Sequence, residues 1–262
     1  MRLVLLGTGS ADGMPNPWCS CATCLDQVRR GRRSPTSVLV DGRLLLDCGP
    51  EAPGQAARLG HSLAGVRTVA VGHAHHDHLD PAFLLHRSWV SEAPLQVVGP
   101  GPVISQAGQW LAPGQTAVGL REVTAGDVVE VDGYRLTALA AGHEAFGEAL
   151  LYLVDDGARR LLYATDTGPL PTATRAALRG ARLDAVLLEE TFGSRTDLGD
   201  GHHHLAGFAT TLAGLRGIGA VHDATLVVAV HLSHYNPPLP ELEAALASHG
   251  ARAYPDGTIL EF

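Results

Sequence analysis

The feature that most constrains this chain is a histidine-rich run that directly follows a short apolar segment. Residues 66–71 are rich in β-branched side chains and short enough to form one buried strand. The next residues read His73-Ala74-His75-His76-Asp77-His78. Imidazoles and a carboxylate at one strand end can converge on a cation, and this set suits zinc, manganese or iron. A solvated polar loop is the alternative, but unpaired polar groups at a buried strand end are costly.

Composition limits the class of protein. With 262 residues, 45% of them hydrophobic, the chain can bury a sizeable core, and no linker divides it, so we expect a single domain over residues 1–262. The net charge of -8 has the wrong sign for a protein that neutralises nucleic-acid phosphates, so extended nucleic acid is not an expected partner.

The sequence shows no sign of secretion or of a membrane span. Residues 1–7 are too short for the core of a signal peptide, and no apolar stretch approaches the ~20 residues of a membrane helix. The expected location is therefore cytoplasmic, without a membrane partner.

A second set of metal-binding side chains precedes the histidine run. Cys19, Cys21 and Cys24 offer three thiolates, one fewer than a closed tetrahedral zinc site needs, so a fourth ligand must come from elsewhere. The alternatives are free buried thiols or a redox pair of Cys21 and Cys24. The arginines within residues 29–33 are interpreted as a solvated helix end.

Apolar runs separated by turn residues predict a chain of strands and helices. We expect strands at 36–40, 44–48, 95–99, 128–131, 134–139, 150–154, 160–164, 183–188, 226–230 and 258–262. We expect helices at 51–60, 81–88, 102–111, 169–178 and 205–216. Asp-Gly pairs at 41–42, 132–133 and 156–157 predict hairpin turns.

The run at residues 73–78 resembles the HxHxDH signature of the metallo-β-lactamase-fold hydrolases. The resemblance implies an α/β protein with the αββα sandwich, in which two mixed sheets are flanked by helices. It implies that His73 and His75 bind a first metal and that Asp77 and His78 bind a second. Asp77 is also expected to be a catalytic residue, and His76 inherits no role.

The same resemblance assigns residues at four later strand ends. It implies that His143 completes the ligands of the first metal, that Asp166 bridges both metals, and that His231 is the last ligand of the second. Asp47 is interpreted as a residue that orients a ligand histidine, with a simple turn or cap residue as the alternative. For Asp166 the alternative is a cap of the following helix.

One branch of this family is particularly similar. Gly-Thr-Gly, CxCxxC, HxHxDH, Asp-Thr-Gly and His-x-x-His all occur in the order found in the cyclic phosphodiesterases of the bacterial carbon-phosphorus lyase (phosphonate) pathway. Coenzyme PQQ biosynthesis protein B is a more distant likeness. In this branch a histidine at the position of His234 completes a structural zinc site with Cys19, Cys21 and Cys24, which implies a zinc-binding loop at residues 8–34.

A histidine triplet precedes the helix expected at 205–216. The resemblance implies that one member donates a proton to the leaving group; His202 is the first choice and His204 the second. Glu189 and Glu190 end another expected strand and receive no role.

The resemblance implies two divalent ions (Zn, Mn or Fe) at the active site and one structural Zn. It implies a hydrolase. The first interpretation is a phosphodiesterase that attacks a small phosphodiester, cyclic diesters included, through a metal-bridging hydroxide. The expected partner is thus a small molecule, and a homodimer is compatible with the sequence. The alternatives are a lactone or thioester hydrolase, an iron-dependent redox or biosynthetic enzyme, and a non-catalytic carrier.

Overall fold

The computed structural model describes residues 1–112, 114–143 and 147–262. Within these ranges the strands form two sheets of seven. The first sheet has the order β14-β1-β2-β3-β4-β5-β6. Its strands are β1 (Arg2–Gly7), β2 (Ser37–Val40), β3 (Leu44–Leu46), β4 (Thr68–Ala70), β5 (Leu95–Gly99), β6 (Val118–Glu122) and β14 (Ile259–Glu261).

The second sheet has the order β13-β12-β11-β10-β9-β8-β7. Its strands are β7 (Val128–Val131), β8 (Tyr134–Ala140), β9 (Leu150–Asp155), β10 (Arg160–Ala164), β11 (Ala185–Glu189), β12 (Leu226–Val230) and β13 (Ala251–Ala253). Both sheets are mixed, because β3 to β6 and β10 to β13 run parallel while the other neighbours are antiparallel.

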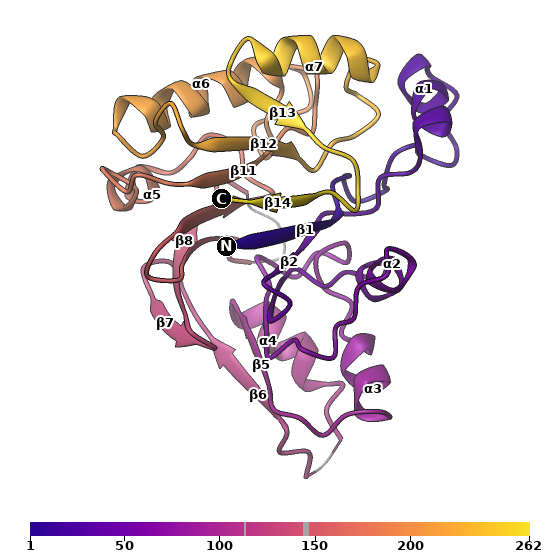
Figure 1. Ribbon diagram of the computed structural model, residues 1–262, viewed down its shortest axis with the longest axis vertical. Coiled ribbons are helices and arrows are strands. Elements are labelled where there is room, and N and C mark those ends of the chain that lie inside the picture. Colours follow the sequence, from indigo (N-terminus) through magenta and orange to yellow (C-terminus); the bar gives the residue numbers. More distant parts are fainter. Residues whose placement is uncertain (113, 144–146) are drawn as a thin grey trace.

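Helices cover the outer faces of both sheets (Figure 1). The helices of the described residues are α1 (Ala22–Arg30), α2 (Ala52–Arg58), α3 (Ala82–Ser88), α4 (Gly101–Gly108), α5 (Thr172–Ala177), α6 (Leu205–Gly217) and α7 (Leu239–Ala247). Of these, α1 lies to one side of the sheets and contacts α7. In Figure 1, α6 and α7 lie above β12 and β13, whereas α2, α3 and α4 lie beside the first sheet. No helix in the described part of the chain combines the length and apolar character needed to cross a bilayer.

Three apolar clusters match this layering. One lies between the sheets and joins Leu3 and Leu5 of β1 to Val228 and Val230 of β12. The second packs α6 and α7 on the second sheet, and the third packs α2, α3 and α4 on the first. The layers therefore run helix, sheet, sheet, helix, which is the αββα sandwich expected from the sequence.

The expected strands are found within one or two residues of their predicted limits in most cases. The parallel strands are the easiest to recognise because both of their faces are buried, as in β11, where all five residues are buried. The strands β6 and β13 and the helix α7 have no counterpart among the expected elements. The strand predicted from residues 66–71 is shorter than expected, since β4 covers only Thr68–Ala70.

The interpretation of residues 29–33 as a solvated helix end is wrong for Arg33. Its side chain is 1% exposed, and Nη1 donates to Thr8 Oγ1 at 2.7 Å and to the carbonyl of Tyr254 at 2.5 Å. Arg29 and Arg30 do lie in the last turn of α1. Arg33 instead ties the chain after α1 to the first strand and to the C-terminal segment.

Candidate metal centre

Seven side chains from four strand ends meet at one edge of the sandwich. The segment after β4 supplies His73, His75, Asp77 and His78; the segments after β8, β10 and β12 supply His143, Asp166 and His231. Since β4 lies in the first sheet and the other three strands in the second, the site requires both sheets. Open α/β sheets place their ligands at such carboxyl ends of strands.

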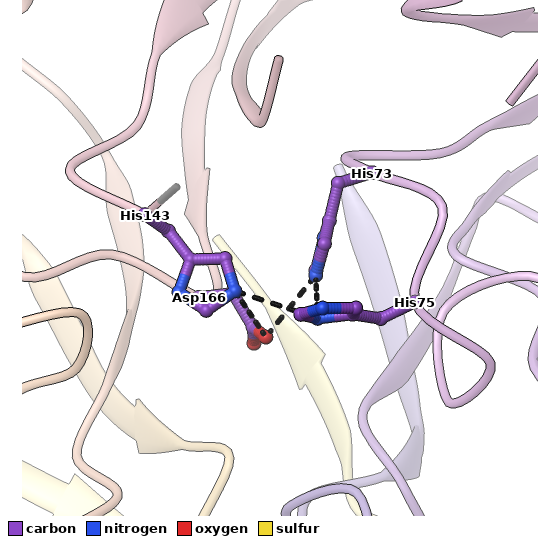
Figure 2. Close-up of side chains that lie close together, drawn as sticks. All are labelled: His73, His75, His143 and Asp166. Atoms are coloured by element: carbon purple, nitrogen blue, oxygen red, sulfur yellow. Dashed lines mark hydrogen bonds and ion pairs between the residues drawn. The ribbon is translucent and has the colours of Figure 1, made fainter. Parts of the chain in front are cut away.

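The first group contains His73, His75, His143 and Asp166, with one ligand atom of each within 4.8 Å of the others (Figure 2). His73 Nε2 lies 2.6 Å from His75 Nδ1 and 3.4 Å from Asp166 Oδ2. His143 Nε2 lies 3.9 Å from the same carboxylate oxygen. The Nδ1 of His143 donates to the carbonyl of Gly201 at 2.9 Å, which leaves Nε2 directed at the group.

The second group contains Asp77, His78, Asp166 and His231, again within 4.8 Å. His78 Nε2 lies 3.0 Å from Asp77 Oδ2 and 3.1 Å from Asp166 Oδ1. His231 Nε2 lies 3.3 Å from Asp77 Oδ2 and 3.0 Å from Asp166 Oδ1. The two oxygens of Asp166 are thus divided between the groups, with Oδ2 toward the first and Oδ1 toward the second.

The donor set fits two cations. His78 Nε2 and Asp166 Oδ1 are buried and lie near each other, yet neither makes a hydrogen bond within the described residues. Buried polar atoms without a hydrogen bond are expensive, and atoms that point at a shared third position relieve this cost when a cation binds there. Imidazole and carboxylate ligands in this ratio suit zinc, manganese or iron.

The carboxylates of the centre are held in their charged form. Burial opposes ionisation, but His231 and His78 outweigh it and keep the pKa of Asp166 well below its usual value. Burial likewise opposes ionisation of Asp77, and His78 and His231 again lower its pKa. Burial lowers the pKa of His73 well below its usual value, so this ring favours the neutral form that a metal ligand needs.

Asp47 orients the ring of His78. The Nδ1 of His78 donates to Asp47 Oδ2 at 2.7 Å, and the hydroxyl of Tyr163 donates to the same oxygen at 2.8 Å. Asp47 Oδ1 accepts from the backbone N–H of Gly72 at 2.9 Å. A carboxylate on one nitrogen of a ligand histidine fixes which nitrogen faces the metal.

The backbone at this corner is unusual in two respects. Asp47, Asp166 and His231 have φ of 58°, 50° and 57°, in the left-handed region that L residues rarely adopt. Gly49 allows a close approach of two segments, because a Cβ there would lie 1.9 Å from the carbonyl oxygen of Asp77. The chain after β3 therefore packs directly on the histidine-rich loop.

The histidine triplet divides its members among three places. His202 stacks on His231 with ring centroids 5.4 Å apart, and its Nδ1 lies 3.0 Å from Glu189 Oε1. His203 is buried at 1% exposure. His204 is the N-cap of α6 and accepts from the backbone N–H of Gly207 at 3.3 Å. Of the three, His202 is the one beside the centre.

Glu189, for which no role is expected from the sequence, holds the ring of His202. Burial favours the neutral ring of His202, but the hydrogen bond and charge of Glu189 outweigh it and raise its pKa to about 9. Glu189 Oε1 also accepts from the backbone N–H of Thr167, at 3.0 Å. The hydroxyl of Thr191 donates to Glu189 Oε2. The oxygen of this hydroxyl also lies 2.9 Å from His231 Nδ1.

The cysteine loop brings its three sulfur atoms together. Cys19, Cys21 and Cys24 lie within 4.8 Å of one another, and Cys21 caps α1 by accepting from the N–H of Cys24. The carbonyl oxygen of His234 lies 3.8 Å from Cys21 Sγ, next to this cluster. Its ring is outside the group of sulfur atoms, 3.5 Å from Asp12 Oδ2.

Residues 42–232 match the family model described as beta-lactamase superfamily domain. Among curated proteins, a ribonuclease Z from Mycobacterium marinum is 28% identical over 270 residues, 91% of this chain and 88% of that protein. An octanoyltransferase from Porphyromonas gingivalis is 35% identical over only 83 residues, 30% of this chain and 16% of that protein.

Two solved structures superpose on the whole chain. A diphosphatase from the PhnP family has a TM-score of 0.77 and 25% identity, with coverage of 100% of this chain and 97% of that one. Zinc-bound PqqB from Methylobacterium extorquens has a TM-score of 0.78 and 21% identity, with 100% of both chains covered. The second likeness concerns the fold alone.

Proposed function

Since the chain belongs to the beta-lactamase superfamily domain family and is a metal-dependent hydrolase of this fold, we propose that it hydrolyses a small phosphodiester. The observation that carries the proposal is the position of Asp166. Its carboxylate is shared by two groups of histidine and aspartate side chains. His202, which belongs to neither group, lies beside them and is held by Glu189. Two cations so placed can hold both the attacking and the departing oxygen of a phosphoryl transfer.

We assign His73, His75 and His143 to one divalent ion and Asp77, His78 and His231 to the other, with Asp166 shared. When bound, these ions neutralise charge on the phosphate oxygens and make a water molecule easier to deprotonate. The hydrogen bond from His78 Nδ1 to Asp47 keeps Nε2 of His78 directed at the second ion. We also assign one zinc ion to Cys19, Cys21 and Cys24 with His234, whose ring must turn from Asp12 to bind it.

His202 is the proposed proton donor. Its ring is held on one nitrogen by Glu189, whose hydrogen bond and charge raise the pKa of His202 to about 9, so the other nitrogen can give a proton to the departing oxygen. During hydrolysis, the water oxygen bonds to phosphorus as the ester P–O bond breaks. The proton of His202 passes to the leaving oxygen, and the proton lost by the water returns the histidine to its starting state.

The relatives support chemistry at phosphorus. Two of them are a ribonuclease and a diphosphatase. The net charge of -8 favours a small substrate over a long polyanion for this chain. We therefore propose a small phosphodiester as the partner and not RNA.

The test of this function combines metal analysis with substrate screening. Protein purified without a histidine tag is assayed with bis(p-nitrophenyl) phosphate and with a series of lactones and thioesters. We expect phosphodiester turnover that a chelator abolishes and added manganese or zinc restores. Turnover of a lactone or thioester with none of the phosphodiester would overturn the proposal.

Replacement of the proposed proton donor separates chemistry from metal binding. We expect His202→Ala to lower kcat roughly 10²- to 10⁴-fold, the usual contribution of a positioned general acid, while metal content stays unchanged. His204→Ala is the matched control, because it removes only the cap of α6 and should affect stability more than kcat. Loss of metal in His202→Ala would instead show that His202 is a ligand.

A further inference from the structure

Hydrogen bonds from two loops hold the backbone where His231 leaves its strand. His231 follows β12 and has a φ of 57°. Its N–H donates to Thr36 Oγ1 at 3.1 Å, and the hydroxyl of Thr36 donates to the carbonyl of Gly9 at 2.9 Å. The N–H of Leu232 donates to the carbonyl of Thr8 at 3.0 Å. These contacts fix the backbone of a proposed metal ligand, but they do not decide which nitrogen of its ring faces the ion.

The hydroxyl of Thr191 contacts that ring. Thr191 is 5% exposed, and its Oγ1 lies 2.9 Å from His231 Nδ1. The same hydroxyl donates to Glu189 Oε2. A hydroxyl has a single proton to donate but can also accept, so the oxygen of Thr191 accepts from His231 and the ring proton lies on Nδ1. The unprotonated Nε2 then faces the second group of ligands, 3.0 Å from Asp166 Oδ1.

The carboxylate behind Thr191 is also held in place. Glu189 is buried, and its Oε1 accepts from the backbone N–H groups of Thr167, at 3.0 Å, and of His203, at 3.2 Å. His202 Nδ1 lies 3.0 Å from the same oxygen. One carboxylate therefore holds the proposed proton donor through one oxygen and, through the hydroxyl of Thr191, a proposed metal ligand through the other.

The main chain of Thr191 is tied on both of its polar groups. Its N–H donates to the carbonyl of His203 at 3.0 Å, and its carbonyl accepts from the hydroxyl of Ser233. These bonds do not depend on the side chain of Thr191. A substitution at this position thus tests the hydroxyl and leaves the path of the backbone unchanged.

We infer that Thr191 is a positioning residue for the second ion, because its hydroxyl keeps the proton of His231 on Nδ1 and makes Nε2 the ligand atom. The inference rests on the proposed assignment of His231 to that ion and on no particular substrate. A hydrogen-bond partner on the outer nitrogen of a ligand histidine orients the ring and raises its basicity. Asp47 has the same relation to His78, the other histidine of this group.

The first test measures metal affinity. Thr191→Val removes the hydroxyl with little change in shape, whereas Thr191→Ser keeps it. In competition with a chelator, we expect Thr191→Val to bind one of the two ions of the histidine and aspartate centre roughly 10- to 100-fold more weakly, the usual effect of losing such a partner. The other ion and the cysteine-bound zinc should be unchanged, and Thr191→Ser should bind metal as wild type does.

Thr225→Val is the matched control for this measurement. Thr225 is buried just before β12, at the end opposite His231. Its hydroxyl donates to the carbonyl of Leu183 at 2.7 Å and accepts from the N–H of His222 at 3.0 Å. We expect Thr225→Val to lower stability without changing metal affinity. Equal weakening in Thr191→Val and Thr225→Val, or weakening of every bound ion in Thr191→Val, would indicate a structural role and overturn the inference.

Nuclear magnetic resonance gives a second readout that needs no turnover. In zinc-loaded protein with ¹⁵N-labelled histidine, the ring of His231 should carry its proton on Nδ1, and this proton should exchange slowly with water because Thr191 accepts it. The exchange should be faster in Thr191→Val and slow again in Thr191→Ser. A His231 ring that binds zinc through Nδ1 in wild type would overturn the inference, even if Thr191→Val did not fold.

These readouts separate the role of Thr191 from the proposed reaction. A weakened ion in Thr191→Val and a protonated Nδ1 in wild type, found in a protein without phosphodiester turnover, retain the positioning role and reject the reaction. Phosphodiester turnover together with unchanged metal affinity in Thr191→Val retains the reaction and overturns the positioning role.

Discussion

At the scale of residues, two adjacent carboxylates at the end of β11 have opposite environments. Glu189 accepts hydrogen bonds from a histidine, a hydroxyl and backbone N–H groups. Glu190 is 0% exposed; its side chain accepts from the N–H of Gly193 through Oε1, and Oε2 has no hydrogen-bond partner in the described structure. Burial and the charge of Glu189 therefore raise the pKa of Glu190 to about 8.

This environment predicts how stability changes with pH. Between about 4.5 and 8 the folded protein holds a proton on Glu190 that the unfolded chain has lost, so this group's contribution to stability falls as pH rises through that window. Glu190→Gln stays neutral throughout. We expect the Tm of Glu190→Gln relative to wild type to increase by several degrees from pH 5 to pH 8.5.

The matched control for this measurement is Glu92→Gln, at an exposed position. Its Tm difference from wild type should not vary with pH. A constant difference for Glu190→Gln as well would show that Glu190 is not held protonated in the folded protein.

Residue roles were only partly readable from the sequence. The strand-end positions of His143, Asp166 and His231 could be assigned, because the family pattern supplied their order. Within the histidine triplet the family resemblance made His202 the first choice and His204 the second. The structure places the ring of His202 on His231, whereas His204 directly precedes the helix, which is the place of an N-cap. The pairing of Glu189 with His202 joins two segments whose contact no local pattern predicts.

At the scale of elements, α1 is fastened to the opposite end of the chain. Thr23 donates to the carbonyl of Asn236, and the N–H of Leu239 donates to Asp26 Oδ2 at 3.3 Å. Asn236 in turn donates to the carbonyl of Glu190 at 3.2 Å. The cysteine cluster at the start of α1 thus adjoins a segment that reaches the strand end of Glu189.

Removing one thiolate should therefore affect one metal and one element. We expect Cys21→Ser to lose one zinc ion per chain, with about two metals retained at the histidine and aspartate centre, and to speed hydrogen exchange in α1. Cys48→Ala, at a buried cysteine outside the cluster, is the control and should keep all the metal. Unchanged zinc content in Cys21→Ser would contradict the assignment of this site.

Elements were predicted best where local and overall preferences agree. The hairpins at Asp41, Asp132 and Asp156 were found because an Asp-Gly pair between apolar runs determines the turn. The burial of Arg33 was missed because its partner carbonyl belongs to Tyr254, 221 residues away. The helix α7 was missed because a proline in its first turn interrupts the apolar pattern.

At the scale of the whole molecule, the centre joins two sheets that have separate outer cores. Four of the seven side chains follow a strand of the first sheet, and the other three follow strands of the second. The layer order could be predicted from strand and helix alternation together with the family resemblance. The alignment of the two sheets at the site depends on close backbone contacts, such as that at Gly49, which sequence patterns do not specify.

Bound metal should consequently stabilise the packing of the two sheets. At free metal about 1,000 times Kd, a single site adds about 4 kcal/mol, which corresponds to a rise in Tm of roughly 10 °C for a chain of this size. We expect calorimetry to show a drop of this order after chelation and its recovery after manganese or zinc is restored. Cys21→Ser should keep most of the change, and an unchanged Tm after complete metal removal would contradict the expectation.

The left-handed backbone at Asp47, Asp166 and His231 limits how this protein can diverge. At both aspartates, asparagine or glycine suits the dihedral angles but gives up the carboxylate, whereas glutamate keeps the charge, lengthens the side chain and loses the conformational preference. No single substitution preserves both properties. Under the roles proposed for them, descendants of this chain can vary around the two aspartates, but each aspartate is kept or its carboxylate is lost in one step.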